Sequence, residues 1–174
     1  NDEPSFSKGS DMTVLEDSGT STTANWATSI SAGPSNESSQ SLTFNVSNNN
    51  TSLFSSAPSV NSSGTLTFTP ASDKNGSATV TVSLSDNGGT SNGGDDTSSQ
   101  TFTITVTAVN DEPSFSKGSD ITVLEDSGAS TTATWATSIS AGPSNESSQS
   151  LTFNVSNNNT SLFSSAPSIN SSGT

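Results

Sequence analysis

Apolar and polar residues alternate along much of the chain, and this is the pattern of a β-strand with one buried and one solvated face. The clearest runs have the apolar positions Leu42, Phe44 and Val46; Leu66 and Phe68; Val80, Val82 and Leu84; and Phe102, Ile104 and Val106. The positions between them are almost all Thr, Ser or Asn. No stretch has helical spacing, so the sequence predicts an all-β protein.

Weaker runs complete the set of expected strands. They lie at residues 11–16, at residues 24–30 and around Val60. Clusters of Gly, Pro, Asn and Ser separate the runs, for example at residues 31–40 and 85–96, and such clusters are typical of turns. About seven short strands in a hundred residues predict an antiparallel Greek-key β-sandwich of the immunoglobulin or cadherin-like type.

The chain repeats itself with a period of 109 residues. Residues 1–65 return as residues 110–174 with the four changes Met12 to Ile121, Thr20 to Ala129, Asn25 to Thr134 and Val60 to Ile169. A period of this length suits independently folded domains in series. We therefore expect a complete domain at residues 1–109 and a second, truncated copy at residues 110–174 that holds only the first four strands, A to D.

The truncated copy lacks counterparts of residues 66–109, so we do not expect it to close a sandwich by itself. Its apolar face would then meet water, which proteins rarely tolerate. Two alternatives stay open: the natural chain continues, or a neighbouring chain adds strands at the open edge.

Trp26 recurs as Trp135, and a solitary Trp is either a carbohydrate platform or a core residue. The core interpretation is favoured because Ala24, Trp26 and Ile30 are expected on one strand face, and a buried Trp is common in such sandwiches.

The composition excludes several classes of function. The net charge is −13, with 16 acidic residues against three lysines, which disfavours binding to nucleic acid or to anionic membranes. No apolar run approaches the roughly 20 residues of a membrane-spanning helix, so membrane insertion is not expected. With no His, no Cys and no catalytic motif, we expect no enzymatic activity.

Acidic residues are expected to meet where one repeat joins the next. If successive strands alternate in direction, the loops with Glu16, Asp17 and Asp73 lie at the end where the chain leaves the first domain. Asn110 and Asp111 follow directly, and the second domain presents Glu146 there. These six residues predict an oxygen-only site suited to Ca²⁺ rather than Zn²⁺. The alternative is a set of solvated acids screened by salt.

Three segments resemble tandem cadherin-like and immunoglobulin-like repeats of large bacterial surface and secreted proteins. They are TAVNDEPSF at the junction, VLEDSG, and GTLTFTPASDKNGSATVTVSLSDNGG. The resemblance implies an extracellular or cell-surface location, a role in stalks or adhesive filaments, and calcium between domains. Its partners would be neighbouring repeats and other copies of the chain in a filament.

Carried over by position, the resemblance implies that Glu16 and Asp17 correspond to the acidic pair at the base of the first strand, and that Asn110 and Asp111 correspond to linker ligands. The chain departs from the pattern at two places. Asp73 stands beside Lys74 with no Asp-Arg-Glu motif, and the loop with Glu146 has no Asp-x-Asp. The number of ions per junction is therefore left open.

The leading hypothesis is a structural repeat of an extracellular stalk, adhesin or filament. The alternative is a glycan-binding or ice-binding module that uses a Thr-rich sheet face, for which Thr101, Thr103, Thr105 and Thr107 are the candidates. Alternating Thr is also an ordinary way to make a solvated sheet face.

Overall fold

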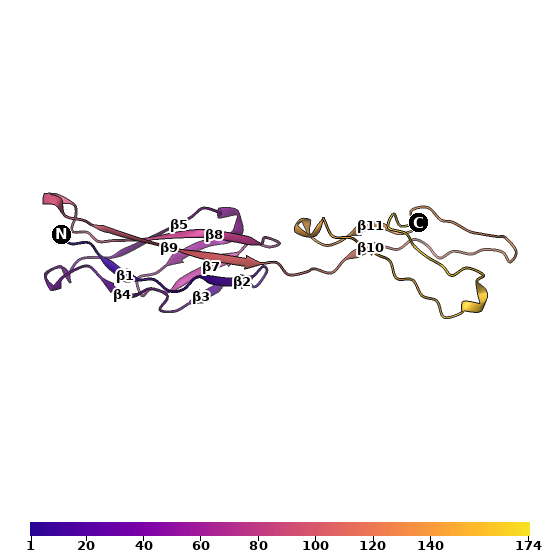
Figure 1. Cartoon of the computed structure of the whole chain (residues 1–174), viewed down its shortest axis with the longest axis horizontal. Coiled ribbons are helices and arrows are strands. Elements are labelled where there is room, and N and C mark those ends of the chain that lie inside the picture. The colour runs from indigo at the N-terminus through magenta and orange to yellow at the C-terminus, as the bar shows by residue number, and fades with distance from the viewer. The chain divides into compact units, whose positions relative to one another are not determined.

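A computed structural model describes all residues 1–174, and the chain divides into unit 1, Asn1–Val109, and unit 2, Asn110–Thr174 (Figure 1). The strands are β1 (Ser5–Ser7), β2 (Met12–Leu15), β3 (Ser21–Thr23), β4 (Thr28–Ser31), β5 (Thr43–Asn48), β6 (Phe54–Val60), β7 (Leu66–Pro70), β8 (Gly76–Ser85), β9 (Thr97–Thr107), β10 (Ser114–Ser116) and β11 (Thr137–Ser140). The helical elements are single 3₁₀ turns: η1 (Ser35–Glu37), η2 (Thr51–Leu53), η3 (Ser91–Gly93), η4 (Ser144–Glu146) and η5 (Thr160–Leu162). The prediction of an all-β protein is confirmed. The chain contains no helix that could cross a membrane.

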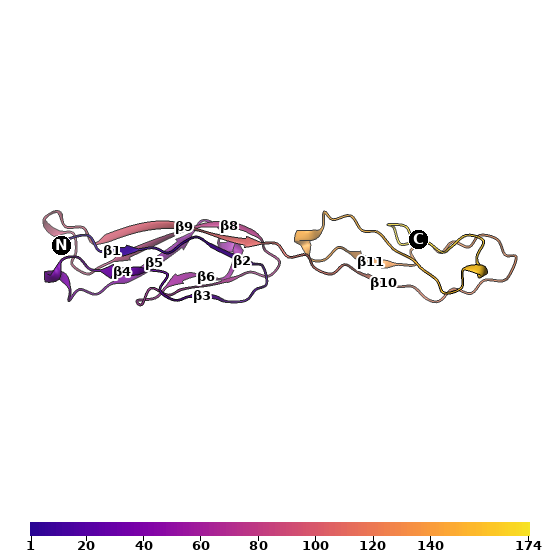
Figure 2. The ribbon, with the colours of Figure 1, turned by 60° about the horizontal axis from the view of Figure 1, so that its bottom comes forward.

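The strands of unit 1 form two main sheets. One has the order β2-β9-β8-β5, and the other has the order β3-β7-β6, while β1 pairs with β4 alone. The hairpin of β8 and β9 is the longest ladder and runs from Gly76↔Val106 to Ser85↔Thr97. In Figure 2, β8 and β9 follow one side of unit 1, and β3 and β6 follow the other.

Alternate residues of both sheets enter one hydrophobic core. Its most deeply buried members are Leu66, Val80, Val82, Leu84 and Ile104, each with 0% of its surface exposed. All of them come from β7, β8 and β9. The strands of residues 66–107 therefore provide the centre of the core, and the earlier strands pack around it.

Trp26 belongs to this core, as the sequence favoured. Its ring lies 4.4 Å from the ring of Phe102, and its indole N–H donates a hydrogen bond to the carbonyl of Ser10 at 3.1 Å. The expected strand at residues 24–30, however, begins only at Thr28. Asn25 takes a left-handed backbone conformation, with φ of 54°, which interrupts the extended chain before Trp26.

Two further features of unit 1 differ from the prediction. β1 and β3 were not predicted, because three residues are too few to show alternation. β2 pairs with β9 in parallel, from Met12↔Ile104 to Leu15↔Thr107, so strand directions do not simply alternate.

Unit 2 departs furthest from the prediction, because it does not form the four strands A to D. Only β10 and β11 are present, and they pair with the register of β1 and β4 shifted by one repeat. The counterparts of β2, β3, β5 and β6 form no ladder. Each of those strands pairs in unit 1 with a partner from residues 66–107, which unit 2 does not have.

Candidate functional site

Glu16 anchors the chain where it leaves unit 1. The residue follows β2 directly, and its amide donates to the carbonyl of Thr107 at 2.9 Å, which continues the parallel ladder. Its side chain is only 2% exposed, and one carboxylate oxygen accepts the amide of Val109 at 2.8 Å. A buried carboxylate needs such donors, because it has lost its water. Glu16 is therefore part of the fold as well as a candidate ligand.

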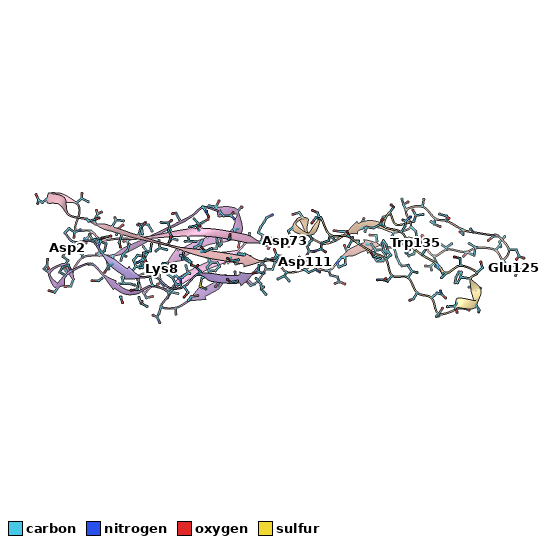
Figure 3. All side chains as sticks on the ribbon, viewed as in Figure 1. Asp2, Lys8, Asp73, Asp111, Glu125 and Trp135 are labelled. Atoms are coloured by element: carbon cyan, nitrogen blue, oxygen red, sulfur yellow. The ribbon has the colours of Figure 1, made fainter.

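Asp73 lies at this end of unit 1, opposite the end that carries Asp2 (Figure 3), and Asp17 contacts it there. The amide of Asp73 points to a carboxylate oxygen of Asp17 at 3.4 Å. Both residues have left-handed backbones, with φ of 59° and 55°. Such conformations occur in tight turns, and Asp tolerates them better than most residues do. The structure thus brings Glu16, Asp17 and Asp73 to one end of unit 1.

Asn110, Asp111 and Glu146 gather at the beginning of unit 2. Glu146 ends the 3₁₀ turn η4 and is 5% exposed. One of its carboxylate oxygens accepts the amide of Asp111 at 2.8 Å, and the other is buried without a hydrogen-bond partner. The side-chain amide of Gln149 donates to the side-chain oxygen of Asn110 at 3.0 Å.

Unit 1 begins with the same arrangement. Glu37 is 7% exposed, and its two carboxylate oxygens accept the amide of Asp2 at 3.1 and 3.2 Å. In both repeats, therefore, a buried glutamate accepts a hydrogen bond from the main-chain amide of the second residue of the repeat, although the glutamate lies 35 residues further along the chain. The sequence analysis missed this role, because a buried glutamate in a polar loop leaves no periodic signal.

The loop between β8 and β9 completes this end in unit 1. The side-chain amide of Asn1 donates to a carboxylate oxygen of Asp86 at 3.0 Å and to the carbonyl of Asp95 at 2.7 Å. Gln40 donates to the side-chain oxygen of Asn1 at 2.8 Å. The second carboxylate oxygen of Asp86 and the side-chain oxygen of Gln40 are buried and accept no hydrogen bond. Oxygen atoms therefore collect around Asn1.

A hard cation such as Ca²⁺ could bind at either end of unit 1 only if carboxylate, side-chain amide and main-chain carbonyl oxygens coordinated it together. No three acidic side chains lie together in a way that could hold a metal ion. The oxygens that do gather include side-chain amides and a main-chain carbonyl, and Ca²⁺ accepts both beside carboxylates. Neither sulfur nor imidazole is present, because the chain has no Cys and no His. That all six predicted residues share one ion stays a prediction.

Comparisons with protein-family models, with curated proteins and with solved structures gave no match. The functional argument below therefore uses the residues and geometry of this chain.

The hydrogen bond from Val109 to Glu16 yields a first prediction. Glu16→Ala leaves the amide of Val109 without its charged acceptor and should lower the free energy of unfolding of unit 1 by about 2 kcal/mol. Glu16→Gln keeps an acceptor oxygen and should cost less. Denaturant unfolding followed by circular dichroism measures both changes.

Glu125 provides the matched control, because it is the counterpart of Glu16 in unit 2 and is exposed there. Glu125→Ala should leave the unfolding of unit 1 unchanged. A loss of stability in Glu125→Ala as large as that in Glu16→Ala would contradict a specific role for the buried carboxylate.

Proposed function

We propose that the chain is a structural repeat of an extracellular stalk, adhesin or filament, without catalytic activity of its own. One observation carries the proposal: the segment that joins the repeats is anchored on both sides. Glu16 of unit 1 holds the amide of Val109, and Glu146 of unit 2 holds the amide of Asp111. Only Asn110 lies between the two anchored amides. Such a short, tied junction suits a chain of domains that must transmit tension.

The proposed fold of each complete repeat is a Greek-key β-sandwich of the immunoglobulin or cadherin-like type. Two observations in unit 1 support it. The sheets β2-β9-β8-β5 and β3-β7-β6 share one core, and consecutive strands such as β7 and β8 belong to different sheets. This division is expected when strands cross between two packed sheets.

We further propose that Ca²⁺ stiffens the junction. The proposed ligands are Glu16, Asp17 and Asp73 from one repeat and Asn110, Asp111 and Glu146 from the next. The acidic side chains repel one another in a chain of net charge −13, and a divalent cation removes that cost. One carboxylate oxygen of Glu146 and one of Asp86 are buried without a hydrogen-bond partner. Buried acceptors normally have a partner, and a bound cation would supply one, so these oxygens support the proposal.

The location and partners follow from the same proposal. As part of a stalk, adhesin or filament, the repeats would lie outside the cell. Each repeat would contact the neighbouring repeats of its own chain and other copies of the chain in a filament. We expect neither nucleic acid binding nor membrane insertion, because a net charge of −13 repels phosphate groups and anionic lipids.

Calcium removal tests the proposed stiffening. A chain of several consecutive copies of residues 1–109 should be longer in small-angle scattering with Ca²⁺ than with a chelator. Its melting temperature should also rise with Ca²⁺, because an ion at a hundred times its dissociation constant adds about 2.7 kcal/mol of stability.

Asp111→Ala at every junction should remove both effects, and Glu112→Ala is the control of equal charge at the next position. Equal maximum dimensions and equal melting temperatures with and without Ca²⁺ would show that Ca²⁺ does not stiffen the junction and would contradict the proposal.

A second candidate function is a glycan-binding or ice-binding face, which one observation favours. The outer face of the β8–β9 ladder carries only hydroxyl side chains in register: Ser77↔Thr105, Thr79↔Thr103, Thr81↔Thr101, Ser83↔Ser99 and Ser85↔Thr97. The hydroxyl oxygens of Ser83 and Ser99 lie 2.6 Å apart. Neighbouring strands are about 4.8 Å apart, so the hydroxyl groups on this face are regularly spaced. None of the ten paired side chains carries a charge.

Placing a charge in the middle of the hydroxyl face tests this alternative. If the face binds, the chain should be retained on a polysaccharide matrix or inhibit ice recrystallisation, and Thr101→Lys should abolish that activity. Thr22→Lys on exposed β3 is the control and should keep it. The absence of both activities in the unmodified chain would reject the alternative and leave the structural role.

A further inference from the structure

The outermost strands of the two sheets in unit 1 each have one main-chain edge without a partner strand. Sheet β2-β9-β8-β5 ends at β2 and β5, and sheet β3-β7-β6 ends at β3 and β6. Such an edge is a template for a strand of another chain, so proteins normally protect it by short length, Pro, charges or bulges. The edges of unit 1 differ in which of these protections they have.

The edges at β3, β6 and β2 are protected. β3 has only three residues, and β6 contains Pro58 and two shifts of register against β7. β2 has four residues and lies between Asp11 and Glu16. Beyond the start of β2, the carboxylate of Asp11 accepts the amide of Thr103 of β9 at 2.9 Å. A side chain therefore occupies the main-chain edge of β9 at that point.

β5 has none of these protections. Its six residues, TFNVSN, include no Pro and no charged residue, and they pair with β8 in one unbroken register. Phe44 and Val46 pack against the core but remain partly exposed. The inward residues of the neighbouring strand β8, such as Val82, are fully buried. β5 is thus open along its outer side.

The main-chain groups of β5 that face outward follow from the ladder. The amide of Asn49 donates to the carbonyl of Thr79 at 3.2 Å, so the main chain of Asn49 faces β8. Successive residues of an antiparallel ladder turn their main-chain groups alternately toward and away from the partner strand. The N–H and C=O groups of Phe44, Val46 and Asn48 therefore face away from β8, and no other strand pairs with them there.

The strands on the β5 side of unit 1 carry no charged residue. The last strands of the two sheets, β5 and β6, contact each other, so they lie on the same side of unit 1. No charged residue occurs between Glu37 and Asp73, a stretch that includes β5, η2 and β6. In a chain with a net charge of −13, two copies approach with least repulsion through a side whose strands carry no acids. This favours a second copy of the chain as the partner.

We propose that β5 pairs antiparallel with β5 of a second copy of the chain, so that two four-stranded sheets become one continuous sheet. In the register that places Val46 opposite Val46, Phe44 lies opposite Asn48, and each pair exchanges two main-chain hydrogen bonds. A twofold axis then relates the copies, and Asn45 faces Ser47 of the other copy. The proposal rests on the proposed function, in which copies of the chain meet in a filament, and names the surface that they use.

Self-association of residues 1–109 tests the proposal, because the core and all ladders of unit 1 lie within this segment. We expect a monomer–dimer equilibrium in analytical ultracentrifugation. Asn45→Lys places a charge beside the twofold axis and should weaken dimerisation at least tenfold. Thr101→Lys adds the same charge to the same face of the sheet, but on β9, and should leave dimerisation unchanged.

Cysteine variants test the register, since the chain has no Cys of its own. A mixture of the Asn45→Cys and Ser47→Cys variants should form disulfide-linked dimers under mild oxidation, because these two positions face each other. Asn45→Cys alone should form far fewer. Its two copies would lie diagonally across the strand pair, about 7 to 8 Å apart, which a disulfide does not span.

Three results would each overturn the proposal. Residues 1–109 could remain monomeric, Asn45→Lys could dimerise as well as Thr101→Lys, or the cysteine mixture could give no more linked dimer than Asn45→Cys alone. None of these results bears on the calcium test of the junction, which measures the length and melting temperature of a single chain. A failure of strand pairing is therefore distinguishable from a failure of the proposed function.

Discussion

A β-strand persists only where another strand satisfies its main-chain hydrogen bonds, and in this protein residues 66–107 provide that partner for four of the six other strands of unit 1, β2, β3, β5 and β6. The repeat makes the dependence visible within one molecule. Almost the same 65 residues occur twice, and they form ladders with β7, β8 and β9 in unit 1 but not in unit 2. The pair β1–β4 is different, because neither strand pairs with residues 66–107. Both of its strands lie within the repeated 65 residues, so its counterpart β10–β11 survives.

The candidate metal ligands depend on the same strands. The parallel pairing of β2 with β9 brings Glu16 beside the last residues of unit 1, where its carboxylate meets Val109. The long hairpin β8–β9 carries Asp86 and Asp95 to the opposite end, where they meet Asn1. The two groups of candidate ligands thus lie at opposite ends of unit 1, and the β8–β9 ladder runs between them. We infer that stability and junction chemistry are coupled in this repeat.

Sequence alone predicted those features that depend on local pattern. Alternation located β5, β7, β8 and β9, because each has one face in the core and one in water. It could not predict the parallel pairing of β2, since pairing depends on residues far away in the chain. The same limit explains why strands were expected throughout unit 2.

The candidate site shows a similar division. Loop positions placed Asp17 near Asp73, and Asp111 near Glu146, and the structure brings each pair together within its own unit. The burial of Glu16, Glu37 and Glu146 could not be predicted, because a charged residue in a polar loop is normally exposed.

Amide hydrogen exchange measured by mass spectrometry tests the central claim most directly. Peptides that end at Val60 or at Ile169 have the same sequence except for one methylene, so their masses distinguish the two copies of this strand. The account predicts strong protection for residues 54–60, which pair with β7, and exchange close to that of an unstructured peptide for residues 163–169. Equal protection of the two peptides would show that the repeated segment folds without residues 66–107 and would contradict the account.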